Sequence, residues 1–326
     1  MRPTIVAEIG ASHAQSFDTA LQLVKQAALA GADAVKFQTW DRMTVSRQMI
    51  TGGEWAGNRM DILYATAKLS WDWHKDLFQA SRALGILPFS SPFDKKSVDF
   101  LESLDCFQYK IASFEITDLD LIRYVAQTKK PIVISTGMAT LEEIRAAVVA
   151  ARGCADITLL KCLSAYPAGA KGYNLAAMKD IAHRFGCHVG VSDHTKSSAV
   201  ACAAIAMGAT MVEKHITCGG KGLDALFATH EQHFGAFVKD CHDTYDAVGQ
   251  VVYGPQPAEQ DQLQFRRSIW ATRDVEEGES FTEDNVAVLR PIGGLPPMFM
   301  PWVLNGTAEC RIAAGTALKY EHVKSA

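Results

Sequence analysis

Strict alternation between two kinds of segment limits what this chain can fold into more than any other feature of its sequence. From residue 4 to about residue 248, short β-branched runs of strand length alternate with stretches whose apolar residues recur at helical spacing. The expected strands are 4–10, 34–38, 87–91, 107–113, 131–136, 157–162, 188–194 and 211–217. The expected helices include 17–30, 71–84, 141–151 and 197–207.

A strand–helix–strand unit repeated in this way implies right-handed crossovers and a parallel sheet. Eight such units suit a closed (β/α)8 barrel, the TIM barrel, better than an open doubly wound sheet. The open sheet is the alternative, and its dinucleotide-binding form needs a glycine-rich first turn. The first turn here reads EIGASHAQ and lacks the GxGxxG pattern, so the sequence favours the α/β barrel.

Two other segments depart from the alternation. Residues 40–70, which contain TGGEWAGN, form a long excursion that we expect on the catalytic face of the barrel. After Val248 the stretch YGPQPAEQDQ has the composition of a linker, with Pro255 and Pro257 interrupting regular structure. From Arg266 short β-like pieces alternate with turn residues, as in a small, mostly β module. The predicted organisation is a barrel over 1–250, a linker over 251–265 and a second domain over 266–326.

Composition and charge argue against several classes of partner. The 326 residues carry a formal net charge of -4 and no basic run, so neither nucleic acid nor an anionic membrane surface is expected as a partner. No apolar run approaches the length that spans a bilayer, and no secretory signal is visible at the N-terminus. The eight cysteines are scattered singly, a pattern typical of reduced thiols. We therefore expect a cytoplasmic protein that acts on small molecules.

Polar residues gather at the carboxyl ends of the expected strands, where barrels of this type carry their chemistry. Period-two alternation predicts which side chains face inward. The inward or strand-end residues are Glu8, Lys36, Gln38, Ser91, Lys110, Ser113, Glu115, Ser135, Ser164, Tyr166, Ser192, His194, Glu213 and His215. One buried histidine is more often a hydrogen-bonded core residue, but charged groups at nearly every strand end are costly unless they bind a ligand.

Two histidines on the last two strands indicate a metal site. His194 and His215 are expected at matching heights on adjacent strands, and Glu213 could ligate the ion or orient its water. So few protein ligands leave positions open for substrate, which suits Mn²⁺ or a similar octahedral ion rather than structural zinc. The alternative is a pair of hydrogen-bonded histidines without a metal.

Lysines and serines form a second group around the same centre. Lys36 and Lys110 are cationic donors, and hydroxyl donors accompany them at Ser91, Ser113, Ser135 and Ser192. Such a collection suits phosphate and carboxylate oxygens together. The loop Gly219–Gly222 could add amide donors, although a plain turn is the commoner explanation of such a sequence.

In these same stretches the chain resembles the N-acetylneuraminate (sialic acid) synthase family. The matching motifs are AEIGASH, GADAVKFQT, FSSPFD, YKIASFEITDL, ISTGMAT, LKCLSAYPA, VSDHT and VEKHIT. The segment RRSIWATRDVEEGESFTEDNVAVLRP resembles the small antifreeze-like (SAF) domain of that family. The resemblance implies condensation of phosphoenolpyruvate with an amino-sugar aldehyde. KIASFEITDL, FSSPFD, LKCLSAYPA and the YGP linker look most like the pseudaminic acid synthase branch, whose acceptor is a diacetamido-trideoxy altropyranose.

The resemblance also implies roles for individual residues. His194 and His215 would bind the metal, most often Mn²⁺, with Mg²⁺ or Co²⁺ as alternatives. Phosphoenolpyruvate would be held by Lys36, Ser91, Lys110, Ser113, Ser135, Ser164, Tyr166 and Ser192. Glu8, Gln38, Glu115 and Asp224 would meet the sugar, and the carboxylates available for proton transfer are Glu8, Glu115 and Glu213. Arg290 matches an arginine that the small domain inserts into the partner's active site, which implies a domain-swapped homodimer.

The implied reaction and its alternatives follow from these roles. Carbon 3 of phosphoenolpyruvate attacks the aldehyde, water adds at carbon 2, and phosphate leaves by C–O cleavage. The chain departs from the family at Ser12–Gln15, where Asn-His-Asn-Gly is usual, at Leu163 in place of threonine, and at Ala228 in place of serine. These departures fall on the sugar side. The alternatives are therefore a neuraminate or legionaminate synthase and, from another class, a non-catalytic sugar-binding homologue.

Overall fold

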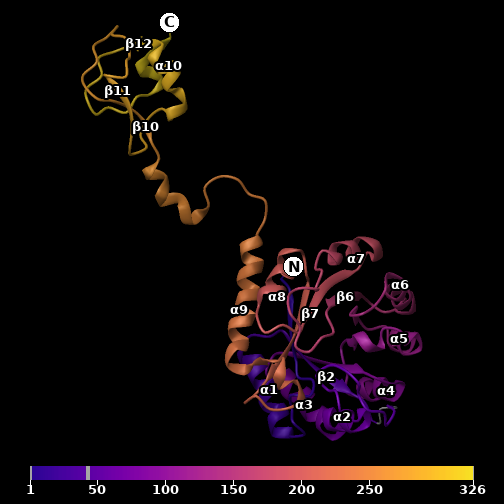
Figure 1. The fold of residues 1–326 in the computed structure, drawn as a ribbon. Helices are drawn as coiled ribbons and strands as arrows, with labels where there is room; N and C mark the ends of the chain where they lie inside the picture. The colour runs from indigo at the N-terminus through magenta and orange to yellow at the C-terminus, as the bar shows by residue number, and fades with distance from the viewer. Residues whose placement is uncertain (1, 42–44, 326) are drawn as a thin grey trace. The chain divides into compact units, whose positions relative to one another are not determined.

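The structure is a computed structural model that describes residues 2–41 and 45–325. The chain divides into two compact units, one ending at Gly249 and one beginning at Gln250, and each is described here by itself. Residues 42–44 of the predicted excursion lie outside the described residues, as do both terminal residues. Figure 1 traces the chain from the strands and helices of the first unit to the small second unit.

The first unit is the predicted barrel. Its strands are β1 (Thr4–Glu8), β2 (Ala34–Thr39), β3 (Leu87–Pro92), β4 (Tyr109–Ile111), β5 (Ile132–Ser135), β6 (Ile157–Cys162), β7 (His188–Asp193) and β8 (Met211–Thr217). Each strand pairs in parallel with the next, and β1 also pairs with β8, so the sheet closes on itself. Glu8 lies beside Lys36 on one side and His215 on the other. A short ninth strand, β9 (Thr229–His230), pairs in parallel with the last two residues of β8.

Helices surround the strands (Figure 1). They are α1 (Phe17–Leu29), α2 (Met60–Ala67), α3 (Trp71–Ala83), α4 (Lys95–Ser103), α5 (Leu119–Ala126), α6 (Leu141–Ala150), α7 (Ala177–Phe185), α8 (Ala199–Ala206) and α9 (Glu231–Val248). Local sequence explains where several of them begin. Ser16 accepts a hydrogen bond from the Thr19 amide at the start of α1, and Thr140 and Glu143 form a capping box on α6.

The core of this unit lies between the strands and the helices. Ile5, Val35, Ile134 and Val212 are fully buried strand residues, and Leu23 of α1 packs in the same cluster. Parallel strands covered on their outer face need apolar side chains there, which is why the runs are rich in valine and isoleucine. The polar inward-facing residues lie toward the carboxyl ends of the strands.

Some element boundaries differ from those predicted. The fourth strand spans only Tyr109–Ile111, because Ser113–Glu115 turns into a 3-10 helix. His194 lies one residue beyond β7, and α8 begins at Ala199 rather than near residue 197. These shifts leave the order of the elements unchanged and move the functional side chains onto the loops that follow the strands.

The second unit is small and mostly β, as predicted. It contains two antiparallel pairs, β10 (Ser268–Ala271) with β11 (Val286–Leu289) and β12 (Gly306–Ala308) with β13 (Val323–Ser325), besides the short helix α10 (Met300–Leu304). Its own core includes Ile269, Phe281, Val303 and Leu318. The expected linker is not irregular throughout: Pro257–Phe265 forms a 3-10 helix with Pro257 in its first turn, a position that proline tolerates.

Candidate active site

A buried group of charged side chains lies at the carboxyl ends of the first strands. The Lys36 ammonium is 2.7 Å from Glu8 Oε2 and donates to Ser91 Oγ at 3.2 Å. Gln38 Nε2 donates to the other oxygen of Glu8 at 2.8 Å. Burial alone would lower the pKa of Lys36, but Glu213 and Glu8 outweigh it and raise that pKa. Lys36 therefore remains a fixed cation inside the barrel.

A second lysine faces the first across Glu213. Lys110 Nζ lies 3.9 Å from Glu213 Oε1, and Ser192 Oγ donates to the same oxygen at 3.1 Å. Burial opposes ionisation of Glu213, but Lys110 and Lys36 hold its pKa below the usual range. Burial lowers the pKa of Lys110 even though Glu213 acts to raise it. An anion bound at this point would offset the free-energy cost of burying the Lys110 charge and would raise its pKa.

Several buried polar atoms around these lysines have no hydrogen-bond partner within the part of the chain that the structure describes. They are Ser135 Oγ, Glu115 Oε2 and Glu213 Oε2. Buried polar atoms are nearly always satisfied in native proteins, so each unsatisfied one needs an explanation. A polar ligand at the ends of the strands provides it.

The two histidines lie together, as predicted from the strand register. The ring centroids of His194 and His215 are 5.4 Å apart. Nδ1 of His194 faces the Leu163 carbonyl at 3.0 Å, and Nδ1 of His215 faces Asp224 Oδ2 at 2.8 Å. A carbonyl oxygen and a carboxylate both accept, so each Nδ1 carries a proton. Burial lowers the pKa of His194, but Cys162 and the Leu163 carbonyl outweigh it and raise that pKa, so a metal ion at Nε2 would displace a proton.

This arrangement fits a divalent metal ion. Metal-binding histidines usually donate their second ring N–H to a carboxylate or carbonyl, which orients the ring. Within residues 2–41 and 45–325 no three His, Cys, Asp or Glu side chains form a ready metal cage, and Glu213 is turned toward the lysines instead. His194 and His215 alone would hold the ion, and its other positions would be left for water and substrate.

Asp224 orients His215, a role that the sequence did not indicate. Besides His215 it accepts a hydrogen bond from the Ala11 amide at 3.0 Å. Gly10 has φ +47°, and a β-carbon there would lie 2.0 Å from Asp224 Oδ2. Only glycine allows the first loop to approach this carboxylate so closely.

Glu115 is a carboxyl group of the site whose pKa is raised, in contrast to that of Glu213. Burial raises its pKa to about 7, although the nearby Lys110 acts in the opposite direction. Glu115 lies in the 3-10 helix that follows β4, where the sequence predicted it just beyond a strand end. At neutral pH it can therefore hold a proton or release one.

Serine hydroxyls and aromatic rings lie around the lysines and histidines of the site. Ser113 Oγ accepts from the Gly137 amide at 3.1 Å, and a β-carbon on Gly137 would lie 2.2 Å from Ser164 Oγ, so both hydroxyls border this loop. The Tyr166 ring centroid is 4.4 Å from that of His194. Phe227, which sequence reasoning missed, packs 4.9 Å from His215 between ring centroids.

Sequence reasoning also missed the support behind the histidines. The Tyr173 hydroxyl accepts from the His194 amide at 2.8 Å. Lys214 and Asp193 form a buried ion pair of 2.9 Å on the outer face of β7 and β8. Asp193 and Lys214 each follow an inward-facing residue, Ser192 and Glu213, and therefore point away from the barrel axis, whereas nothing in the sequence signals Tyr173.

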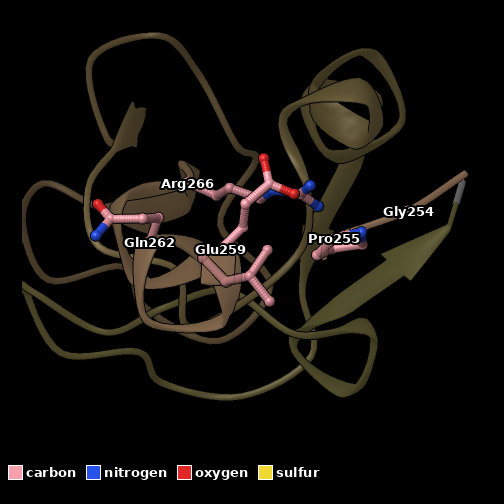
Figure 2. A pocket seen from close by; sticks show the side chains of 6 residues that line it. Gly254, Pro255, Glu259, Gln262 and Arg266 are labelled. Atoms are coloured by element: carbon pink, nitrogen blue, oxygen red, sulfur yellow. The ribbon is translucent and has the colours of Figure 1, made fainter. Parts of the chain in front are cut away.

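Arg290 lies in the second unit and is exposed, and its Nε donates to the Phe265 carbonyl at 2.7 Å. It borders a cavity of about 500 Å³ that Arg266 and Arg267 also line. A cavity of about 400 Å³ opens beside the 3-10 helix of this unit (Figure 2). Its lining residues are Gly254, Pro255, Glu259, Gln262, Leu263 and Arg266. Neither cavity includes a residue of the barrel.

The chain matches known proteins along most of its length. Residues 23–253 match the NeuB family, and residues 266–324 match the SAF domain. The chain belongs to the NeuB family. The family and the SAF domain expected from the motifs are thereby confirmed.

Relatives of this NeuB family member come from several bacteria. Pseudaminic acid synthase of Campylobacter jejuni subsp. jejuni serotype O:23/36 is 37% identical, over 97% of this chain and 95% of that protein. N,N'-diacetyllegionaminic acid synthase of Legionella pneumophila subsp. pneumophila is 33% identical, over 98% and 94%. The crystal structure of N-acetylneuraminic acid synthetase from Leptospira borgpetersenii, in complex with citrate, has a TM-score of 0.72 and 27% identity, over 81% of this chain and 90% of that one. Across the described residues no helix has the length and apolar character to cross a membrane.

Proposed function

We propose that this chain is a nonulosonic acid synthase, which condenses phosphoenolpyruvate with an open-chain acetamido sugar aldehyde and releases phosphate. The observation that carries the proposal is the buried pair Lys36 and Lys110 beside the unpartnered hydroxyl of Ser135, three donors that face one centre. Such a cradle suits a small ligand with several anionic oxygens. The 37% identity to a pseudaminic acid synthase over nearly the whole chain supports the same class of reaction.

In the proposed complex, the phosphate and carboxylate of phosphoenolpyruvate lie against Lys36 and Lys110. The hydroxyl donors that complete the cradle are Ser91, Ser113, Ser135, Ser164, Tyr166 and Ser192. Lys110, whose pKa burial lowers, gains a counter-charge when the anion binds. Binding therefore stabilises the charged form of this lysine.

His194 and His215 would hold a divalent ion through their Nε2 atoms, with Mn²⁺ as the expected ion and Mg²⁺ or Co²⁺ as alternatives. When bound, the ion supplies Lewis acidity toward the aldehyde oxygen of the sugar. Asp224 and the Leu163 carbonyl fix the two rings through Nδ1, so the histidines need no reorganisation.

The bond changes require one proton donor and one carboxylate. The new C–C bond joins carbon 3 of phosphoenolpyruvate to the aldehyde carbon, whose oxygen gains a proton. Water then adds at carbon 2 and passes one proton to the ionised Glu115. The C–O bond to phosphate breaks as the hydroxyl at carbon 2 becomes the ketone and its proton passes to the departing phosphate. Glu115, with a pKa of about 7, is suited to donate the proton. Glu213, held ionised by the lysines, is suited to stabilise positive charge at carbon 2, and Glu8 keeps Lys36 in place.

Within this class we propose pseudaminic acid synthesis, with a diacetamido-trideoxy altropyranose as the acceptor. Gln38 and Asp224 would contact this sugar from the barrel. The motif resemblance and the Campylobacter jejuni relative support this choice. Synthesis of legionaminate or neuraminate is the alternative, since a legionaminic acid synthase is 33% identical.

We also propose a domain-swapped homodimer in which Arg290 of one chain reaches the acceptor sugar in its partner. The exposure of Arg290 in its own unit and the hydrogen bond that orients it support this role. A cytoplasmic location is proposed as well, since all eight cysteines are free thiols, as expected in a reducing compartment.

The test is phosphate release from phosphoenolpyruvate and Mn²⁺ with a panel of aldehyde sugars. We expect turnover of the diacetamido-trideoxy sugar and little turnover of N-acetylmannosamine; the reverse preference would overturn the pseudaminate assignment. No turnover with any sugar would favour the non-catalytic sugar-binding homologue. His215→Ala is the matched control, expected to stay folded and to lose metal-dependent turnover.

A further inference from the structure

The loop between β1 and α1 has a strained backbone where this chain departs from its family. Ala14 and Gln15 have φ of 50° and 57°, in the left-handed region. Residues with a β-carbon adopt this conformation only at a cost in free energy, and they keep it where the surroundings hold them. Something in the structure must therefore hold this loop in place.

Helix α2 provides the contacts that hold it. Gln15 Nε2 faces the carbonyls of Ala65, Thr66 and Lys68 at 3.2, 2.7 and 3.0 Å. The last four carbonyls of a helix have no partner inside the helix, so a side-chain donor at that point stabilises the end.

His13 completes the same set of contacts. Its Nδ1 accepts from the Gln15 amide at 3.1 Å, so its Nε2 carries the proton and donates to the Ala67 carbonyl at 3.2 Å. Two side chains of one loop thereby place three N–H donors, two from Gln15 and one from His13, against the four consecutive carbonyls of residues 65–68. Burial lowers the pKa of His13, which keeps the ring in the neutral form that this arrangement requires.

Helix α2 packs against Trp40, just beyond the end of β2, near the residues proposed to contact the sugar. The Tyr64 ring lies 6.1 Å from that of Trp40, which follows β2 and is 2% exposed. Trp40 in turn lies 4.9 Å from Phe93, which follows β3. Gln38, proposed to contact the acceptor, is two residues before Trp40. Burial, with a contribution from the Glu115 carboxylate, raises the pKa of Tyr64.

The other end of the loop reaches the histidine pair. The Ala11 amide donates to Asp224, and Asp224 holds the ring of His215. The short loop after β1 thus contacts both Asp224, which holds His215, and the C-terminus of helix α2. A shift of α2 relative to the histidines would change the space open to the sugar and leave the lysine cradle intact.

We infer that Gln15 is a positioning residue for acceptor selectivity, which fastens α2 over the sugar side through the carbonyls at its C-terminus. The inference rests on the proposed function of the barrel site. Because Gln15 lies at the surface, it can be replaced without opening the core.

The chemistry of the three carbonyls makes the inference testable. All three are acceptors, so Gln15→Lys keeps donors and adds a positive charge that suits a helix C-terminus. Gln15→Glu retains the size but offers only acceptors at neutral pH, and its charge is repelled by the carbonyls. Gln15→Gly removes the side chain and at the same time relieves the left-handed strain, so the fold itself is not endangered.

The experiment compares these three variants with the unaltered chain in two readouts. Hydrogen exchange of the α2 amides is expected to quicken about 10-fold in Gln15→Glu and Gln15→Gly, the change that loss of net hydrogen bonding implies. The KM for the acceptor sugar is expected to rise about 5- to 10-fold in both, with the KM for phosphoenolpyruvate unchanged. Gln15→Lys should leave both the exchange rate and the KM for the acceptor at the values of the unaltered chain.

Two results would overturn the inference: equal exchange in Gln15→Glu and the unaltered chain, or a rise in both KM values together. Failure of the proposed function looks different, because the unaltered chain itself would then turn over no sugar. The exchange measurement needs no substrate and still tests the contact in that case.

Discussion

Replacement of Glu115 by glutamine should raise stability at alkaline pH and remove activity. The side chain is half-buried, its inaccessible Oε2 has no hydrogen-bond partner among the described residues, and burial raises its pKa from 4.5 to about 7. An unfolded glutamate releases its proton near pH 4.5, whereas the folded one retains it until about pH 7. The unfolded state therefore binds fewer protons across this window, and the free energy of unfolding falls as pH rises through it.

The magnitude follows from the same shift. Moving the pKa from 4.5 to about 7 corresponds to at most about 3 kcal/mol of stability lost between those pH values. Because glutamine does not ionise, the variant does not lose this part of the free energy of unfolding as the pH rises. The stability of Glu115→Gln relative to the unaltered chain should therefore improve by about 2–3 kcal/mol between pH 4.5 and pH 8.

The assay is urea unfolding of the substrate-free and metal-free protein at several pH values, with the difference between variant and unaltered chain plotted against pH. Glu283→Gln, at an exposed position in the second unit, is the control and should give a flat difference. A flat difference for Glu115→Gln as well would refute the argument that burial controls this carboxyl. Turnover by Glu115→Gln should fall by about 100-fold or more, the usual contribution of a general acid. Unchanged turnover would remove Glu115 from the proton-transfer step.

Three further substitutions test other parts of the site. Gly10→Ala places a β-carbon 2.0 Å from Asp224 Oδ2 at a φ of +47°. We expect urea unfolding to show about 2 kcal/mol of destabilisation and electron paramagnetic resonance to show about 10-fold weaker Mn²⁺ binding. Values equal to those of the unaltered chain in both measurements would contradict this expectation. Lys214→Met leaves the Asp193 carboxylate buried without its ion pair, so thermal unfolding should show a loss of about 3–5 kcal/mol, and an unchanged melting temperature would contradict this. Arg290→Ala should raise the KM for the acceptor more than that for phosphoenolpyruvate, and equal effects on both would argue against the domain-swapped site.

Much of the fold could be predicted because its signals are local. Period-two alternation depends only on the geometry of one strand, so the sequence predicted the inward direction of Glu8, Lys36 and Glu213. The boundaries were less certain, because a turn such as Ser113–Glu115 depends on what it packs against. Helix formation over 257–265 was hidden for a similar reason, since prolines signal a linker and a first helical turn alike.

The sequence predicted which residues lie at the strand ends around the site, but not the contacts that hold them there. Residue types at strand ends indicated two histidines, two lysines and several serines around one centre. They did not indicate that Asp224 fixes His215, nor that Tyr173 supports His194. The unusual acidity of Glu115 was also beyond the sequence, because burial controls it and burial is a property of the folded chain.

By itself, the sequence determined the barrel, the SAF domain, the family and the face of each strand, since these follow from spacing along the chain. Only the tertiary structure decided how distant loops meet. Pairing of β1 with β8 closes the barrel and brings the Ala11 amide to Asp224, which lies 213 residues further along the chain. Pairing of β1 with β2 places the loop that follows β1 beside the segment that follows β2, and so brings Gln15 to the end of α2. Contacts of this kind have no period and no local signal, because they arise only when strands have paired and their loops lie at the same end of the sheet.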